Sequence, residues 1–249
     1  ESYMVLSTAG SGGMGTVYVA SKEGSDDKYA LKICNNSNES RKDREAVILE
    51  KLVSVKHPNI VRFLGSSYLD KRLIILMELV QGVSLDLWLQ HKGIVSLQDA
   101  KTIMLQFADG MSAVHSHKIA HRDLKPSNLM IDDVTGNIVI VDFGLSKELN
   151  ANMTVTSAKS VIGTAMYMSP EQLEGITSAV DLRSDVWAMG IICYEIVAGN
   201  TPFQPPSLDE SRIFTAILSK PVPELPADAA PAPFQLVVRK ALEKKQEDR

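Results

Sequence analysis

The sequence HRDLKPSN, residues 121–128, brings a carboxylate, an ammonium group and an amide together in one short segment that contains a proline. These groups belong to Asp123, Lys125 and Asn128. The segment lies between a long helical pattern, residues 96–118, and a short apolar strand pattern, residues 129–131. Polar side chains on a loop between two rigid elements are typical of a functional site. We therefore expect a site here rather than part of the core.

A second carboxylate, Asp142, opens the triplet Asp142-Phe143-Gly144. The apolar run of residues 138–141 precedes it and predicts a strand, so this carboxylate ends a second strand. Asp and Asn side chains also cap turns, and that is the alternative for each of these residues taken alone.

Glycines interrupt the alternating pattern of residues 1–35, with the spacing Gly-x-Gly-x-x-Gly over residues 10–15. The flanking apolar runs predict a hairpin with a glycine-rich tip. A dinucleotide-binding turn has the same spacing but continues into a helix, whereas residues 16–19 (TVYV) favour a strand. Such a tip lets backbone N–H groups approach phosphate oxygens without obstruction by a Cβ atom. An ordinary glycine-rich hairpin is the alternative.

Lys32 lies in a predicted strand, residues 28–34, whose period of two puts Ala30, Lys32 and Cys34 on one face. We expect Lys32 to point where the glycine-rich tip points. A solvated strand lysine is the alternative, which its apolar neighbours on both sides disfavour.

Together these segments resemble the catalytic loop, the Asp-Phe-Gly segment and the glycine-rich loop of a eukaryotic-type protein kinase. Lys125 in the catalytic loop and the later Thr164 resemble the serine/threonine class rather than tyrosine kinases. The resemblance covers nearly the whole chain, in the family's order. It implies an α+β, bilobal protein-kinase-like fold, with a small antiparallel β-sheet lobe that has one helix and a larger, mainly helical lobe.

One protein kinase domain is expected over residues 1–249. The resemblance places the small lobe at about residues 1–79, the hinge at about 78–83 and the large lobe at about 84–249. The family has a further helical segment after the arginine that Arg249 resembles, so we expect this sequence to lack that last helical segment.

The resemblance also implies ATP and Mg²⁺ as cofactors and gives each polar residue a role. Asp123 would accept the proton of the substrate hydroxyl. Lys125 would balance charge on the γ-phosphoryl group as it moves. Asn128 and Asp142 would hold magnesium, because hard cations prefer oxygen ligands.

In the small lobe, Lys32 would bind the α- and β-phosphates of the nucleotide and would be held in place by Glu45. Glu50 is the rival partner in the same helical pattern, residues 37–53. The residues expected to bind the cofactor are Gly10, Gly12, Gly13, Gly15, Val17, Ala30, Lys32, Met77, Glu78, Val80, Met130 and Asp142.

In the large lobe, residues 186–198 are apolar on nearly every side and predict a buried helix. Asp185 resembles the family's aspartate that caps this helix and anchors the backbone of the catalytic loop. Arg249 resembles the arginine that pairs with Glu171. Further helices are expected over residues 96–118, 208–218 and 234–244.

Residues 145–169 are polar, rich in Ser and Thr, and typical of a loop. The family register places the main activation-loop phosphosite at Ser160, with Thr156 as a second candidate. A phosphate at Ser160 would draw three cations together through charge-assisted hydrogen bonds and would activate the enzyme. These cations are Arg41, Arg122 and Lys147. The expected partners are therefore a protein substrate with a Ser or Thr acceptor and an upstream activating kinase.

The composition argues against several other classes of function. A formal charge of -4 and a pI near 5.8 give no basic surface for nucleic acid or anionic membranes. No apolar segment is long enough for membrane insertion. Cys34 and Cys193 are expected to be reduced thiols, which favours a cytoplasmic location. A metal site at His115, His117 and His121 is disfavoured, because no cysteine supports it.

The leading hypothesis is an active serine/threonine protein kinase. The first alternative is a pseudokinase that binds nucleotide and acts as a scaffold, which the complete set of polar residues disfavours. The second is a small-molecule kinase, and the run of residues 163–171 (GTAMYMSPE) argues against it, because it resembles a segment that docks protein substrates.

Overall fold

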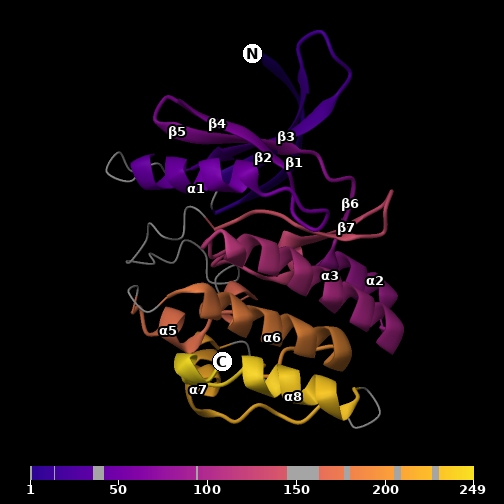
Figure 1. Ribbon diagram of the computed structural model, residues 1–249, viewed down its shortest axis with the longest axis vertical. Helices are drawn as coiled ribbons and strands as arrows, with labels where there is room; N and C mark the ends of the chain where they lie inside the picture. The colour runs from indigo at the N-terminus through magenta and orange to yellow at the C-terminus, as the bar shows by residue number, and fades with distance from the viewer. Residues whose placement is uncertain are drawn as a thin grey trace.

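The computed structural model describes residues 2–13, 15–35, 42–93, 95–144, 163–176, 180–204, 209–225 and 230–249. Figure 1 shows a β-sheet with one helix in the N-terminal part and a mainly helical part that carries the C-terminus. The expected α+β fold with two lobes is therefore confirmed. Within the described ranges, no helix combines the length and the apolar character that crossing a membrane requires.

The small lobe is built on a five-stranded antiparallel sheet with the strand order β1-β2-β3-β5-β4. Its strands are β1 (Tyr3–Gly12), β2 (Gly15–Lys22), β3 (Lys28–Cys34), β4 (Phe63–Leu69) and β5 (Arg72–Glu78). Helix α1 (Lys42–Ser54) packs against β4 and buries Leu49 and Leu52 in the core. This helix lies directly beneath the sheet in Figure 1.

The side chains of β3 alternate between buried and less buried positions, because successive residues of a strand point to opposite faces. Ala30, Lys32 and Cys34 are all buried, as their shared face predicts. Across the β3–β5 pair, Lys32 lies opposite Ile75 and Ala30 lies opposite Met77, both also buried. The ammonium-bearing side chain of Lys32 thus enters a largely apolar interior.

A second, three-stranded sheet lies where the two lobes meet. Its strands are β6 (Gly82–Ser84), β7 (Leu129–Asp132) and β8 (Ile138–Ile140), in that order. A Cβ atom at Gly82 would lie 1.9 Å from the carbonyl oxygen of Ile131, so only glycine allows β6 to approach β7 this closely. Backbone hydrogen bonds of 2.8 and 2.9 Å join Ile140 to Asn59 and Val61, just before β4. The polar loops that adjoin β7 and β8 are thereby tied to the small lobe.

Helices dominate the large lobe (Figure 1). They are α2 (Leu85–Lys92), α3 (Leu97–Ser116), α5 (Pro170–Leu173), α6 (Leu182–Ala198), α7 (Glu210–Ser219) and α8 (Ala232–Ala241), with the 3-10 turns η2 (Pro126–Asn128) and η4 (Gln246–Asp248). The predicted helices over residues 96–118, 208–218 and 234–244 correspond to α3, α7 and α8.

Helix α6 begins at Leu182, before the predicted start at residue 186. Asp181 caps it by accepting a hydrogen bond from the backbone N–H of Arg183 at 2.7 Å, whereas Asp185 lies within the first turn. The prediction that Asp185 caps the helix was wrong. Its first turn is polar, so the apolar pattern could not reveal it, and Ser184 is buried there because Glu171 accepts its hydroxyl hydrogen.

A second core surrounds Trp187, which is fully buried and stacks on Phe203 with ring centroids 5.8 Å apart. The ammonium of Lys244 lies 3.8 Å from the centroid of Phe203 and 4.9 Å from that of Trp187. It donates a hydrogen bond to the carbonyl oxygen of Ile217 at 2.6 Å. Burial, and then the positive charge of Arg249, lower the pKa of Lys244 to about 8.

Lys244 is expected to make the protein more stable as the pH rises from about 8 to 10.5. The folded-state pKa of about 8 lies below the ordinary value of 10.5, so in this interval the unfolded chain binds more protons than the folded one. Below pH 8 the cost of burying the ammonium is present in full. We expect the urea midpoint of the wild type to rise relative to that of Lys244→Met between about pH 7 and pH 10. A difference that stays constant with pH would contradict this assignment.

Candidate active site

The catalytic-loop segment, residues 121–128, is held by the carboxylate of Asp185, which is 1% exposed. This carboxylate accepts the backbone N–H groups of His121 and Arg122, both at 2.8 Å, and lies 2.9 Å from Nε2 of His115. Arg122 has a φ of 64°, in the left-handed region that costs energy outside glycine. Two charge-assisted hydrogen bonds offset that cost, so Asp185 anchors the loop as the resemblance implies.

His121 joins this segment to the triplet that begins at Asp142. Its ring is fully buried, and burial lowers its pKa, so the imidazole is neutral and has one donor and one acceptor nitrogen. Nε2 donates to the carbonyl oxygen of Val141 at 3.0 Å, and Nδ1 accepts from the backbone N–H of Asp123 at 3.3 Å. Phe143 packs on the same ring with centroids 4.5 Å apart. One side chain therefore sets the position of both polar segments.

Asp123 is only 3% exposed, and its carboxylate lies beside two donor groups. Its Oδ2 atom is 3.2 Å from Nζ of Lys125 and 3.3 Å from Nδ2 of Asn128. Asn128 also donates to the backbone carbonyl of Asp123 at 2.7 Å. These contacts hold the carboxylate in one orientation, as a residue that accepts a proton in a reaction requires.

Asn128 and Asp142 supply oxygen atoms at neighbouring strand ends. The amide nitrogen of Asn128 donates to Asp123, which leaves the amide oxygen to face a ligand. The backbone N–H of Val141 donates to the carbonyl of Asn128 at 2.9 Å, and this bond brings Asp142 alongside. The Asp142 carboxylate is 33% exposed. This donor set fits Mg²⁺, which in phosphate sites is bound through one or two carboxylates and completes its shell with phosphates and water.

The three histidines weighed as metal ligands have other partners. His115 contacts Asp185, Nδ1 of His117 lies 2.9 Å from the carbonyl oxygen of Ala113, and both ring nitrogens of His121 are engaged. In the part of the chain that the structure describes, no group of three or more His, Cys, Asp or Glu side chains is arranged to hold a metal ion.

Lys32 and Glu45 are both buried, at 5% and 4% exposure, but they are not paired as predicted. Among the described residues, the ion pair of Lys32 is with Asp142, and Glu45 accepts a hydrogen bond from the hydroxyl of Tyr68 at 2.9 Å. All of these charges act on the buried thiol of Cys34: burial raises its pKa, Lys32 lowers it, and Asp142 and Glu45 raise it. Lys32, Asp142 and Glu45 thus all lie near enough to Cys34 to affect the pKa of its thiol, and we call these three charged residues the cluster.

The helical pattern could place Glu45 on the inner face of α1, but it could not say which donor its carboxylate meets. Glu50, the alternative partner of Lys32, is exposed on the same helix. Burial therefore favours Glu45 as the acidic residue of the cluster.

Strands β1 and β2 form the predicted hairpin around the glycine motif, and Gly12 pairs with Gly15 at its end. Gly15 has a φ of 152°, and a Cβ atom there would lie 2.3 Å from the carbonyl oxygen of Ile33, so glycine is required. At Gly10, Gly12 and Gly13 an added Cβ atom meets nothing within 4 Å. These three positions thus face open space, where a ligand could approach the backbone.

Three of the apolar residues predicted to contact the nucleotide lie on neighbouring strands. Val17 lies opposite Lys32 on the β2–β3 pair, and Ala30 lies opposite Met77 on the β3–β5 pair. Ala30 and Met77 are buried, and Val17 is half-buried. The structure therefore brings these side chains next to Lys32.

The segment expected to be the hinge follows β5. The backbone N–H of Glu78 donates to the carbonyl of Arg62 at 2.9 Å, so any backbone contact of Glu78 with a nucleotide must use its carbonyl. Val80 is half-buried two residues further on, and Met130 is half-buried on β7.

A hollow opens beside Asp123, and its walls include Arg122, Thr164, Tyr167 and Gln172. The predicted phosphosites Ser160 and Thr156, and the cations Arg41 and Lys147, lie outside the described residues.

Several contacts of this site were not predicted, and two of them show how far the sequence could have revealed them. The hydrogen bond of Tyr68 to Glu45 left no signal, because one tyrosine in a strand says nothing about the acceptor of its hydroxyl. The contact of His115 with Asp185 could have been expected from the position of His115 near the end of the helix that leads into the loop.

The profile of the family described as "Protein kinase domain" matches residues 3–249. Serine/threonine-protein kinase PrkC of Bacillus subtilis is 36% identical over 81% of this chain and 31% of its own length. Serine/threonine-protein kinase AtPK2/AtPK19 of Arabidopsis thaliana is 33% identical over 82% of this chain and 42% of its own length. Serine/threonine-protein kinase Pkn1 of Myxococcus xanthus is 30% identical over 100% of this chain and 36% of its own length.

The chain spans less than half the length of each of these relatives. Nearly the whole of its own sequence, including the glycine-rich hairpin, the HRDLKPSN segment and the Asp142 triplet, falls within the family match. With this match added to the geometry of the site, the chain belongs to the protein kinase domain family.

Proposed function

We propose that this chain is the catalytic domain of an active serine/threonine protein kinase that transfers the γ-phosphate of ATP to Ser or Thr hydroxyls of protein substrates. The observation that carries the proposal is the buried carboxylate of Asp123, oriented by Lys125 and Asn128 on a loop that Asp185 anchors. The relatives named above are serine/threonine-protein kinases, which supports the same class of acceptor.

The chemistry asks the protein mainly for positioning and for charge neutralisation. Asp123 orients the acceptor hydroxyl and takes its proton, and Lys125 offsets negative charge on the γ-phosphoryl group. Asn128 and Asp142 are the residues that would hold Mg²⁺, which when bound neutralises charge on the phosphates. Lys32 binds the α- and β-phosphates, and Glu45 holds Lys32 in that position.

The nucleotide is proposed to lie between the glycine-rich hairpin and β7. The backbone of Gly10, Gly12, Gly13 and Gly15 covers the phosphates, which the open space at three of these positions favours. The adenine ring is enclosed by Val17, Ala30, Met77 and Met130, and the backbone of Glu78 and Val80 binds its edge.

Regulation by phosphorylation of the activation loop is proposed at Ser160, with Thr156 as the second candidate. A phosphate there would attract Arg41, Arg122 and Lys147, so an upstream activating kinase is the expected partner. Cys34 and Cys193 are free thiols, which is consistent with a cytoplasmic location.

The test is transfer of radiolabelled γ-phosphate from ATP with Mg²⁺ to a generic protein substrate and to the chain itself, with phosphoamino-acid analysis of the product. We expect phosphoserine or phosphothreonine that depends on Mg²⁺. ATP binding without transfer would overturn the proposal in favour of a nucleotide-gated binding module. Labelled phosphotyrosine alone would overturn the assignment of the acceptor.

A further inference from the structure

Glu45 accepts a hydrogen bond from Tyr68, and the proposed function assigns it a second donor, Lys32. Its Oε2 atom accepts a hydrogen bond from the hydroxyl of Tyr68 at 2.9 Å. The ammonium of Lys32, which the proposed function assigns to Glu45, is paired with Asp142. Glu45 is only 4% exposed, and a buried carboxylate requires hydrogen-bond donors.

The register of the sheet places Lys32 and Tyr68 on the same face, on two strands that β5 separates. Lys32 on β3 lies opposite Ile75 on β5, and Ile75 lies opposite Ser66 on β4. Tyr68 follows Ser66 by two residues on β4, so its side chain points to the same face as that of Lys32. Lys32 and Tyr68 are separated by two strand spacings across the sheet and by two residues along the strand direction. Their backbones therefore lie about 12 Å apart.

Helix α1 packs on β4 and presents Glu45 to this face of the sheet. A glutamate on the helix therefore meets Tyr68 when its carboxylate turns toward β4 and Lys32 when it turns toward β3. A hydrogen bond to an ionised acceptor contributes more than a neutral one, so the phenol competes effectively for this carboxylate.

From this arrangement we infer that Tyr68 is a positioning residue that competes with Lys32 for the carboxylate of Glu45 and so sets the affinity of the kinase for ATP. While Tyr68 binds Glu45, Lys32 forms an ion pair with Asp142. In this state neither Lys32, which is proposed to bind the phosphates, nor Asp142, which is proposed to bind the metal, is available to its ligand. When Glu45 takes Lys32, Asp142 is released. The inference rests on the proposed function, because it concerns the residues assigned there to ATP.

The variant that tests it is Tyr68→Phe, which keeps the ring and removes only the hydroxyl. Without the competing donor we expect the KM for ATP to fall about tenfold, the lower end of the effect of a hydrogen bond to a charged group, with kcat within about twofold of the wild type. Without ATP the variant should also unfold at a lower urea concentration, because Glu45 loses a donor. A purely structural role predicts instead that stability and ATP affinity fall together.

Two further variants make the test specific. In the background Glu45→Gln, which cannot form the ion pair with Lys32, adding Tyr68→Phe should leave the KM for ATP unchanged. Tyr29→Phe is the matched control, because Tyr29 is in the same sheet and its ring packs against Tyr3, away from this cluster. It should change neither the KM for ATP nor kcat.

The dissociation constant of ATP, measured by calorimetry without a protein substrate, separates this inference from the proposed function. A wild type that binds ATP but transfers no phosphate overturns the proposed function and still allows the affinities to be compared. If Tyr68→Phe binds ATP no more tightly than the wild type, the role of Tyr68 is overturned. The role is also overturned if Tyr68→Phe strengthens ATP binding equally in the Glu45→Gln background. A wild type that does not bind ATP overturns both.

Discussion

Replacement of Asp123 by asparagine is expected to lower the rate of phosphate transfer by about a thousandfold, within the range that removal of a general base produces. The amide has nearly the same shape as the carboxylate and can still accept from Lys125 and Asn128, whose nitrogens lie 3.2 and 3.3 Å from Oδ2. What it loses is the ability to take a proton. The loop should therefore keep its structure while the chemical step fails.

The measurement is kcat for a protein substrate, together with the dissociation constant of ATP for the same preparation. We expect ATP affinity to stay within about threefold of the wild type, because Asp123 is assigned to the acceptor and not to the nucleotide. Asp133→Asn is the matched control, because it makes the same chemical change at an exposed position after β7. Transfer at the wild-type rate by Asp123→Asn would contradict the assignment, as would an equal loss in Asp133→Asn.

The parts of this molecule that could be predicted from sequence are those in which a local pattern dictates local geometry. The period of two in β3 places Ala30, Lys32 and Cys34 on one face of the strand, and the structure shows that this face is buried. The glycine spacing followed by β-branched residues predicts a hairpin, because β-branched residues favour strands over helices. Short polar segments that follow apolar runs predict loops at strand ends, and Asp123 and Asp142 lie on such loops.

The partners of buried charges could not be predicted in the same way. Lys32 pairs with Asp142 rather than with Glu45, and Glu45 accepts from Tyr68, a residue more than twenty positions away in sequence. The start of α6 was misplaced for a related reason. Its first turn carries two buried polar residues that bind distant groups: Ser184 donates to Glu171, and Asp185 accepts from the backbone of the catalytic loop.

Replacement of Arg249 by methionine is expected to lower the free energy of unfolding by about 3–5 kcal/mol, the usual cost of breaking a buried ion pair by removing one partner. The side chain of Arg249 is 0% exposed and that of Glu171 is 7% exposed. Both guanidinium NH₂ nitrogens bind the carboxylate, at 2.7 and 2.8 Å, and Nε donates to the carbonyl of Glu243 at 2.9 Å. The variant would leave the buried carboxylate of Glu171 with the hydrogen bond from the Ser184 hydroxyl, at 2.6 Å, but without the cation that balances its charge.

The loss of stability in Arg249→Met should depend on pH, and the pKa of Glu171 determines the direction. Burial alone would raise this pKa, but the hydrogen bonds from Arg249 and Ser184 outweigh it and hold the pKa below its ordinary value of 4.5. The pair therefore stabilises the wild type above about pH 4.5, and this contribution is lost as the pH falls through the lower, folded-state pKa. A protonated Glu171 needs no cation, so the deficit of Arg249→Met should shrink in acid.

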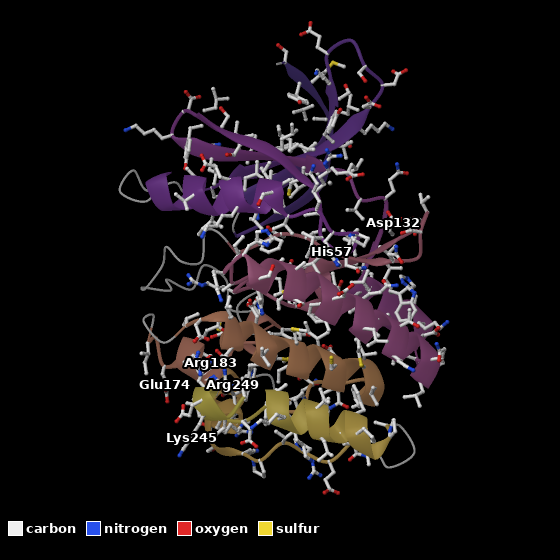
Figure 2. All side chains as sticks on the ribbon, in the orientation of Figure 1. His57, Asp132, Glu174, Arg183, Lys245 and Arg249 are labelled. Carbon is white, nitrogen blue, oxygen red and sulfur yellow. The ribbon has the colours of Figure 1, made fainter. Side chains whose placement is uncertain are left out.

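Arg183→Met is the matched control, because it removes the same kind of side chain from an exposed pair. Arg183 and its partner Asp181 are 46% and 44% exposed, so solvent screens their attraction and the pair contributes little to stability. Figure 2 shows Arg183 and Arg249 at the same end of the large lobe, so the two variants test neighbouring sites that differ in burial. The measurement is the urea midpoint at neutral and acidic pH. Equal losses in the two variants, or a deficit of Arg249→Met that grows in acid, would show that burial of the Arg249–Glu171 pair does not hold this end of the lobe together.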